Sequence, residues 1–226
     1  MARRIIVVLK FTQQLVPSTC NLLAIRTMST LQPHVNHDAG RITDWIMEAS
    51  THMANAVLHT IGYEGSSIDE FLGTLLLTGV DLVIDVRDVP ISRKKGFSKT
   101  ALAGRLAGSG MEYIHLKGLG DPKPGRIAAR EGRYDDFRQI FGAHLKGQIA
   151  QTDVMRGIQA AQGRRACLLC FERDHTNCHR CIVAEDMAAK GGFRLVHLSV
   201  RTGMSASSIV NVRNSSKSYG PGAVVG

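Results

Sequence analysis

Several features are scarce or missing in this chain of 226 residues, and each absence excludes a class of protein. No apolar run reaches the roughly 18 residues of a membrane-spanning helix, so we expect no membrane association. Aromatic residues make up only 5% of the chain, which leaves few platforms for stacking nucleic-acid bases. Gly118 and Gly120 follow a predicted strand, but the third glycine of a dinucleotide-binding fingerprint would fall at Pro122-Lys123 and is missing.

Acidic residues are outnumbered, and this imbalance favours an anionic partner. The chain has 28 lysines and arginines against 19 acidic residues, a formal charge of +9. Residues 1–52 carry 5 basic and 3 acidic groups, residues 53–200 carry 20 and 16, and residues 201–226 carry 3 and none. Residues 87–138 alone hold 12 basic and 6 acidic groups, so the excess charge of the middle segment is local.

These segments predict the domain organisation. We predict that residues 53–200 form one folded domain. Residues 201–226 are rich in Ser, Gly and Asn and have no apolar periodicity, so we predict a disordered basic tail. In residues 1–52, Lys10 interrupts the apolar run too early for an export signal. A mis-called start before Met53 is our preferred interpretation; an organellar presequence and an appended segment with a helix near residues 43–54 are the alternatives.

Strands and helices alternate from residue 57 onward. We predict strands at residues 57–61, 81–86, 111–116, 165–170 and 194–198, helices at about residues 66–79, 99–107, 134–148, 152–162 and 178–190, and a long Gly/Pro-rich loop at residues 117–133. The alternation predicts an α/β fold of three layers: a mostly parallel sheet of at least five strands with helices on both faces.

Polar residues follow the predicted strands at the sheet edge where open α/β folds bind their ligands. The candidate ligand-binding residues are Tyr63, Glu64, Asp85, Arg87, Ser92, Arg93, His115 and Arg180. The candidate catalytic residues are Cys170, Glu172, Cys178 and His179. We expect these side chains to meet at one edge of the sheet, because the carboxyl ends of parallel strands lie together.

The loop after the second predicted strand is the most basic part of the chain. It holds Arg87, Arg93, Lys94, Lys95 and Lys99 within 13 residues. Guanidinium groups bind phosphate or carboxylate through a planar fork, so the loop predicts an anion site. Arg87 is the strongest candidate, because it directly follows a buried strand and Asp85 is placed to orient it. A solvated run of charges is the alternative.

Four of the five cysteines fall within 15 residues, as two C-x2-C pairs. This spacing is typical of metal or thiol sites in a reducing compartment, so we expect a cytoplasmic protein. Four thiolates can bind zinc or an iron–sulfur cluster. However, Cys167 and Cys170 are three residues apart on a strand and point to opposite faces, and Cys181 lies among apolar helix residues. We therefore expect buried structural thiols at Cys167 and Cys181, and neither a metal nor a cofactor.

Cys170 and Cys178 are candidate nucleophiles. Cys170 ends a strand at the predicted site, and Cys178 begins a helix beside His179 and Arg180, where the helix dipole and a cation favour a thiolate. The alternative is a buried polar network in which His179 and Arg180 hold Glu172 or Asp85.

Four motifs occur in the order Thr60-Ile-Gly-Tyr-Glu64-Gly, Asp85-Val-Arg87-x-x-Pro90-x-Ser92-Arg93, Tyr113-x-His115-x-x-x-Leu119-Gly120 and Cys170-x-Glu172-(x5)-Cys178-His179-Arg180. In this order and spacing they resemble the family called domain of unknown function 488, over about residues 57–198. The resemblance implies an α/β architecture and a site made of the signature residues, but no reaction. Cys167 and Cys181 lie outside the signature, which further weakens the four-thiolate hypothesis.

Three functions remain open. The first is an enzyme or binding module for a phosphorylated or nucleotide-like anionic ligand, held by Arg87, Arg93 and Arg180, with acid and base from the last loop. The second is thiol chemistry, because the strand ending at Cys170 and its following helix resemble rhodanese sulfurtransferases in outline, although the loop after the cysteine is longer. The third is a nucleic-acid-binding accessory protein that uses the basic loop and tail.

Overall fold

The computed structural model describes residues 56–207 and residue 209. Its elements are β1 (Val57–Gly62), α2 (Ile68–Thr78), β2 (Leu82–Asp85), α3 (Lys99–Ala107), β3 (Glu112–His115), the 3-10 helix η2 (Lys117–Leu119), α4 (Lys123–Arg130), α5 (Tyr134–Leu145), α6 (Gln148–Ala161), β4 (Ala166–Cys170), α7 (His179–Gly191) and β5 (Arg194–Leu198). The predicted helix near residues 43–54 and the rest of the segment 1–52 lie outside the described residues.

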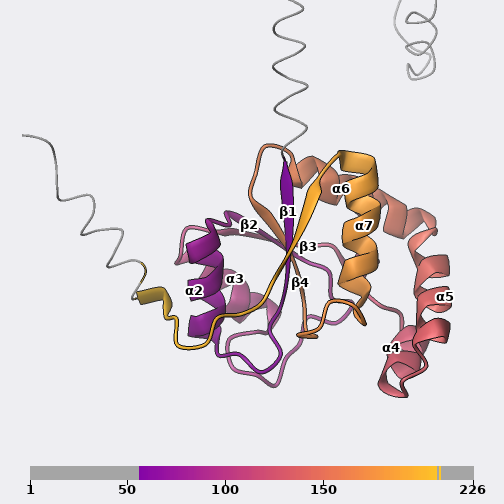
Figure 1. Ribbon diagram of the computed structural model, residues 1–226, viewed down its shortest axis with the longest axis horizontal. Helices are drawn as coiled ribbons and strands as arrows, with labels where there is room; N and C mark the ends of the chain where they lie inside the picture. Colours follow the sequence, from indigo (N-terminus) through magenta and orange to yellow (C-terminus); the bar gives the residue numbers. More distant parts are fainter. Residues whose placement is uncertain (1–55, 208, 210–226) are drawn as a thin grey trace, which may run out of the picture. The chain divides into compact units, whose positions relative to one another are not determined.

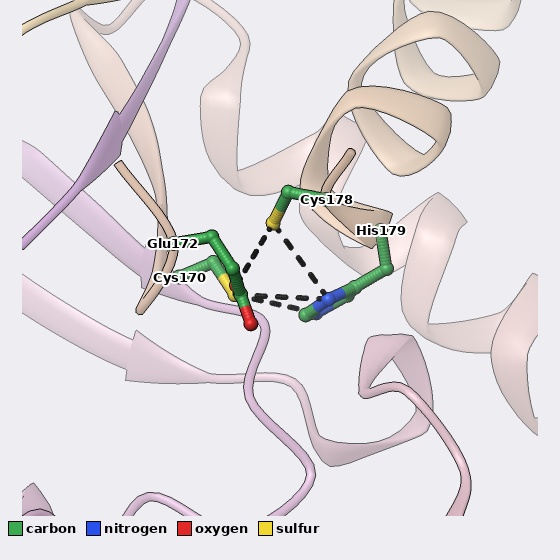
Figure 2. Close-up of side chains that lie close together, drawn as sticks. All are labelled: Cys170, Glu172, Cys178 and His179. Carbon is green, nitrogen blue, oxygen red and sulfur yellow. Dashed lines mark hydrogen bonds between the residues drawn. The ribbon is translucent and has the colours of Figure 1, made fainter. Parts of the chain in front are cut away.

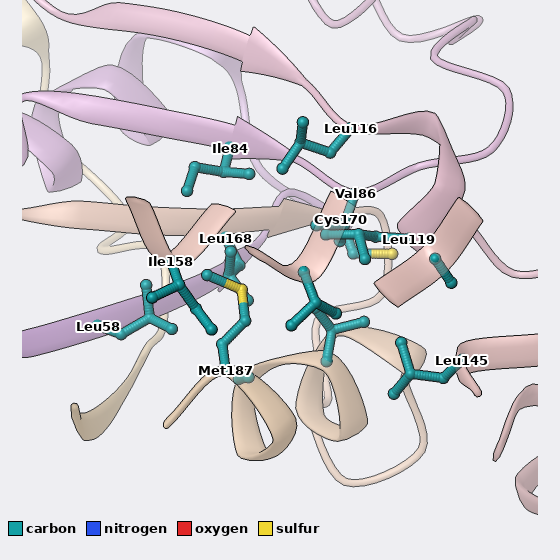
Figure 3. Close-up of a cluster of buried hydrophobic side chains, with 14 of the residues drawn as sticks. Leu58, Ile84, Val86, Leu116, Leu119, Leu145, Ile158, Leu168, Cys170 and Met187 are labelled. Carbon is teal, nitrogen blue, oxygen red and sulfur yellow. The ribbon is translucent and has the colours of Figure 1, made fainter. Parts of the chain in front are cut away.

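The five strands form one sheet in the order β3-β2-β4-β1-β5, and every pairing is parallel. Helices α2 and α3 cover one face, and α5, α6 and α7 cover the other, so the predicted three-layer α/β fold is confirmed (Figure 1). Alternate residues of β4 enter the two cores: Leu168 and Cys170 pack under α5–α7 (Figure 3), whereas Cys167 and Leu169 pack under α2 and α3.

Local sequence signals explain several element boundaries. Helix α2 begins with a capping box, in which Ser67 and Glu70 satisfy each other's backbone N–H groups. It ends at Gly79, whose left-handed conformation (φ 72°) suits glycine. Helix α3 and strand β5 have the bounds that the sequence predicts.

The predicted loop at residues 117–133 is wrong in part, because it contains η2 and α4. Pro122 and Pro124 lie at the cap and in the first turn of α4. Proline is tolerated there because the first N–H groups of a helix have no partner within it. The glycines and prolines that indicate a loop therefore begin a helix, and α4 brings its charged residues to the edge of the sheet.

The segment predicted to be a disordered tail begins with ordered residues. The backbone N–H of Arg201 donates to Thr74 Oγ1 at 3.0 Å, and that of Gly203 donates to Glu70 Oε1 at 3.0 Å. Ala206 packs against the core under α2 and α3. The prediction of disorder is therefore wrong for residues 201–207, while residue 208 and residues 210–226 lie outside the described part. Within that part, no helix has the length and hydrophobicity to cross a lipid bilayer.

The topology creates a crevice beside β4. Strands β1 and β2 lead into α2 and α3 on one face, whereas β4, which lies between them, leads into α7 on the other (Figure 1). The loops after neighbouring strands therefore diverge at the carboxyl edge of the sheet. Open α/β folds bind their ligands at such switch points.

Candidate functional site

A pocket of about 660 Å³ lies at this edge of the sheet. Its lining combines the end of β4, the loop after β2 and residues of α4: Tyr63, Arg87, Asp88, Val89, Ile91, Ser92, Arg93, Lys94, Asp121, Arg126, Arg130, Cys170, Phe171, Glu172 and His179. A larger hollow of about 890 Å³ at the start of α2 is lined by no cysteine or histidine. The chemistry-bearing residues therefore favour the smaller pocket.

The four candidate catalytic residues form one compact cluster (Figure 2). Cys170 Sγ lies 2.8 Å from Glu172 Oε2 and 3.6 Å from His179 Nδ1. Cys178 Sγ lies 3.1 Å from the same Glu172 oxygen and 3.9 Å from His179 Nδ1. Both sulfurs are buried, while Glu172 is partly exposed at the pocket. The sequence-based expectation that these four residues meet is confirmed.

Regular elements fix three of the four residues. Cys170 ends β4, Cys178 caps α7 and His179 is the first residue of that helix. Glu172 lies in the loop between them, and the Arg180 guanidinium donates hydrogen bonds to the backbone carbonyls of Glu172 and Arg173. Arg180 therefore holds the loop.

Gly62 allows this loop to pack against β1. A Cβ atom at Gly62 would lie 1.8 Å from the carbonyl oxygen of Glu172, so only glycine permits the close approach.

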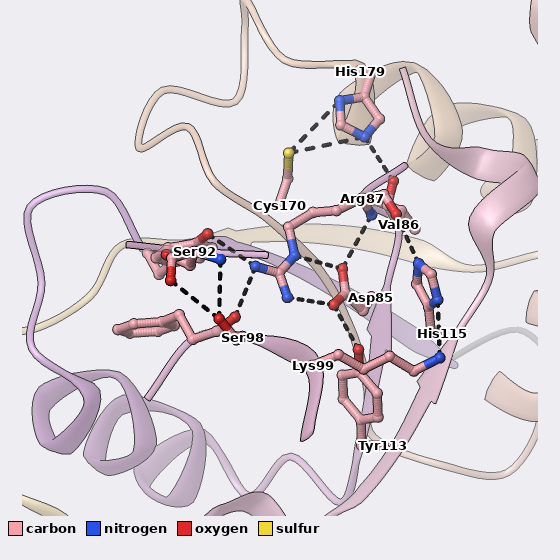
Figure 4. A network of polar contacts seen from close by, with 12 residues as sticks. Asp85, Val86, Arg87, Ser92, Ser98, Lys99, Tyr113, His115, Cys170 and His179 are labelled. Atoms are coloured by element: carbon pink, nitrogen blue, oxygen red, sulfur yellow. Dashed lines mark hydrogen bonds and ion pairs between the residues drawn. The ribbon is translucent and has the colours of Figure 1, made fainter. Parts of the chain in front are cut away.

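The orientation of His179 is set by the main chain. Its Nε2 lies 2.9 Å from the carbonyl oxygen of Val86, which can only accept a hydrogen bond (Figure 4). Nε2 therefore carries a proton, and Nδ1 lies within 4 Å of both sulfurs, while Cys170 Sγ is also 3.9 Å from Nε2.

The environment of the cluster shifts its acid–base equilibria. Burial raises the pKa of both the Cys170 and the Cys178 thiols. This direction is opposite to the thiolate that the helix start predicts at Cys178, because burial disfavours the charged form of the thiol. Burial alone would raise the pKa of Glu172, but hydrogen bonds from Cys170 and the nearby His179 hold it below its usual range.

Arg87 belongs to a buried network rather than to an open anion site (Figure 4). Its Nε and NH2 groups donate to the two carboxylate oxygens of Asp85 at 2.8 and 2.6 Å. Its NH1 group donates to Tyr63 Oη and to the carbonyl of Phe97, each at 2.9 Å. Asp85 does orient Arg87, but four donors are already used, so the prediction that Arg87 is the principal anion ligand is not supported.

Other predicted ligand-binding residues are dispersed. Tyr63, Ser92 and Arg93 line the pocket, as the sequence predicts. Glu64 lines an adjoining hollow and accepts a hydrogen bond from the Arg173 N–H at 2.9 Å. His115 donates to the Arg87 carbonyl at 2.8 Å and lines a different hollow. Neither His115 nor Arg180 contacts the pocket.

Lys94, from the basic loop for which the sequence predicts an anion site, lines the pocket, whereas sequence reasoning missed Asp121, Arg126 and Arg130. Arg126 and Arg130 are four residues apart on α4 and share a face, a signal hidden by the loop prediction. Arg126 pairs with Asp88 at 2.6 Å and so ties α4 to the loop after β2.

Asp121 is buried, and its Oδ1 accepts no hydrogen bond from any residue that the structure describes. Burial raises its pKa to about 6. This carboxylate borders the pocket near Glu172 and His179.

The four cysteines do not converge. Cys167 packs on the opposite face of the sheet from Cys170, and Cys181 Sγ lies 3.4 Å from Glu185 on the partly exposed side of α7. The four-thiolate site is therefore excluded. Cys181 is only partly buried, whereas the sequence predicts a buried thiol. It does not belong to the face of α7 that packs on the sheet.

The sequence of the chain is similar to a known protein family. A family model described as "Domain of unknown function DUF488" matches residues 67–187, which is more than half of the chain. The chain belongs to the DUF488 family. The match covers most of the sheet and the whole Cys170–His179 segment, so the cluster lies within the DUF488 domain. No curated protein and no solved structure matches the chain.

Proposed function

We propose that this DUF488 protein binds a small phosphorylated, nucleotide-like ligand in the pocket and acts on it as an enzyme. One observation carries the proposal: cationic side chains from two separate segments converge over a buried reactive cluster. Arg93 and Lys94 come from the loop after β2, and Arg126 and Arg130 come from α4.

Three of these cations are available to a ligand. In the described residues, no ion pair involves Arg93, Lys94 or Arg130. A phosphate group can accept paired hydrogen bonds from each guanidinium. We therefore keep Arg93 as a proposed anion ligand. Arg87 and Arg180 instead make hydrogen bonds within the protein that hold Asp85 and the loop after β4.

Apolar side chains line the same pocket and support a nucleotide-like ligand over a bare anion. Val89, Ile91 and Phe171 are 52%, 78% and 43% exposed, although each is large and hydrophobic. An exposed aromatic ring can stack on a base. The volume of the pocket falls in the range of small-molecule sites, which is roughly 300–1,000 Å³.

The inner end of the pocket supplies acid–base groups. Glu172 has a lowered pKa and is ionised at neutral pH. Burial alone would lower the pKa of His179, but Cys178 and Glu172 raise it to about 9, so His179 is a proton donor at neutral pH. Both line the pocket, where a positioned proton acceptor and a positioned proton donor contribute to catalysis.

Thiol chemistry of the rhodanese kind is the second candidate. It is favoured by the 3.6 Å separation of Cys170 Sγ and His179 Nδ1, which resembles a nucleophile and its base. It is disfavoured by the raised pKa of the Cys170 thiol, because the thiolate is the nucleophile.

Isothermal titration with ADP, pyrophosphate, adenosine and a short single-stranded oligonucleotide tests the proposal. We expect ADP to bind more tightly than pyrophosphate or adenosine, and Arg93→Gln and Arg130→Gln each to weaken ADP binding by about tenfold. Arg138→Gln is the matched control, because Arg138 is exposed on α5 outside the pocket. Equal losses in all three variants, or binding of the oligonucleotide alone, would contradict the proposal; the second result would favour the nucleic-acid alternative.

A further inference from the structure

The Cys170–His179 cluster has a second property that acid–base chemistry does not require. One potential ligand atom from each of Cys170, Glu172, Cys178 and His179 lies within 4.8 Å of all the others. We propose that the cluster is a zinc site, in which Cys170, Cys178 and His179 are the fixed ligands and the Glu172 carboxylate is the fourth.

The distances fit tetrahedral zinc. With Zn–S bonds of about 2.3 Å and Zn–N bonds of about 2.0 Å, a tetrahedral site separates sulfur from nitrogen by about 3.6 Å. His179 Nδ1 lies 3.6 Å from Cys170 Sγ and 3.9 Å from Cys178 Sγ. Cys170 Sγ is also 3.9 Å from Nε2, so zinc binding would require a rotation of the Cys170 or His179 side chain that directs the Nδ1 lone pair at the metal. Glu172 Oε2 lies 2.8 and 3.1 Å from the two sulfurs, as an acceptor of thiol hydrogen bonds. Zinc would require this carboxylate to withdraw by about half an ångström, which its position in a loop allows.

The surroundings of His179 match those of a metal-bound histidine. Such a ligand donates its other ring N–H to a carbonyl or carboxylate, which fixes the tautomer and the ring plane. His179 Nε2 donates to the Val86 carbonyl at 2.9 Å. This bond connects the cluster to the strand end that also carries the Asp85–Arg87 pair (Figure 4).

The positions of the ligands predict a preformed site with one exchangeable position. Cys170, Cys178 and His179 are buried on β4 and at the start of α7, so their backbones are fixed before a metal arrives. Glu172 is partly exposed and lines the pocket. Catalytic zinc sites keep one position that water or substrate can take.

The inference departs from the sequence-based expectation of no metal and does not depend on the ligand of the proposed function. The zinc ligands are two cysteines, a histidine and a glutamate within ten residues, rather than the four cysteines. Binding would release the two thiol protons to solvent and tie up both sulfurs in metal bonds. It would therefore exclude Cys170 as a free nucleophile and would also occupy Glu172 and His179, the acid–base groups of the proposed function, while leaving the cations of the anion pocket free.

Metal binding by the full-length protein tests the inference directly. Protein purified under reducing conditions is stripped with a chelator, and zinc uptake is measured by native mass spectrometry. We expect one zinc per chain. Replacement by cobalt(II) should give intense visible bands of a tetrahedral site and near-ultraviolet thiolate-to-cobalt charge transfer. An uptake of no zinc, or a cobalt spectrum without thiolate bands, would overturn the proposal.

Substitution of single cysteines shows which side chains bind the zinc. Cys170→Ser and Cys178→Ser should each weaken zinc binding by more than about 100-fold. Substitution of a residue that only hydrogen-bonds to a metal ligand already lowers metal affinity by about 10–100-fold. Cys181→Ser and Cys20→Ser are the matched controls and should keep stoichiometric zinc. If Cys178→Ser retains the affinity of the parent protein, the assignment is wrong. Circular dichroism reports whether each variant folds, and the cobalt spectrum of the parent protein decides the proposal if a variant does not.

Discussion

At the residue scale, Arg87 shows how a cation beside a pocket can serve the fold. Its guanidinium is buried and makes two hydrogen bonds with the Asp85 carboxylate. Burial alone would lower the pKa of Arg87, but Asp85 holds it above its usual range. Removing one partner of a buried ion pair leaves an uncompensated charge, which costs more than the net contribution of the intact pair.

We therefore expect Asp85→Asn to lower the free energy of unfolding by about 3 to 5 kcal/mol in urea denaturation. The matched control is Asp69→Asn, whose ion pair with Arg105 has both side chains at least half exposed. That change should cost less than about 1 kcal/mol. Equal effects of the two substitutions would show that the buried pair has no special role.

Asp121 presents the opposite case, a buried carboxylate without a donor for Oδ1 in the described structure. Its pKa is raised from 3.8 to about 6 by burial. Between these values the folded protein holds the proton more tightly than the unfolded chain. The stabilisation by the protonated form is therefore complete below pH 3.8 and is lost as the pH rises through about 6.

Asp121→Asn should remove this pH dependence, because an amide carries no charge. We expect the variant to be more stable than the parent protein by about 1 to 2 kcal/mol at pH 7.5, with no gain near pH 4. Thermal or urea unfolding in the presence of a chelator measures the difference. Asp135→Asn, an exposed carboxylate on α5, is the control and should show no such gain. A gain that is the same at both pH values would contradict the assignment.

At the element scale, the loop between β4 and α7 determines the geometry of the cluster. Its path depends on the missing side chain at Gly62, where a Cβ atom would overlap the Glu172 carbonyl. It also depends on the Arg180 guanidinium, which donates to two carbonyls of the loop. The site is thus built by contacts between elements rather than within the loop.

Gly62→Ala should displace this loop. We expect a loss of about 1 to 3 kcal/mol in stability, because the overlap is with backbone, together with a loss of zinc binding. Gly104→Ala is the control, since Gly104 is exposed on α3 with open space around its Cβ position. That change should stabilise the protein by up to about 1 kcal/mol. If Gly62→Ala keeps both its stability and its zinc, the role assigned to Gly62 is wrong.

At the scale of the whole molecule, the fold could be predicted from the sequence wherever local and tertiary signals agree. Helix α2 has its own cap signals, and the buried strand β4 is a continuous apolar run. Helix α4 could not be predicted in this way, because Pro122, Pro124 and Gly125 favour a loop. Its stability comes from packing, with Ala128 in the core under α5 and α7.

The candidate site could be predicted as a set of residues but not as a set of roles. Strand ends place Cys170 and the start of α7 together, so the cluster follows from parallel topology. Whether Arg87 or Arg93 is free for a ligand depends on which carboxylate lies within reach, and sequence spacing does not contain that information. Asp121 and Arg130 enter the pocket only through the tertiary placement of α4.

The central claim is that the pocket over the Cys170–His179 cluster binds the phosphate of a ligand. A crystal structure of the protein soaked with tungstate, a heavy analogue of phosphate, tests it most directly through anomalous scattering. We expect a peak within hydrogen-bond distance of Arg93, Arg126 or Arg130. A peak only in the hollow at the start of α2, beside Lys95 and Arg105, or in the hollow lined by Lys99 and His115, would contradict the claim.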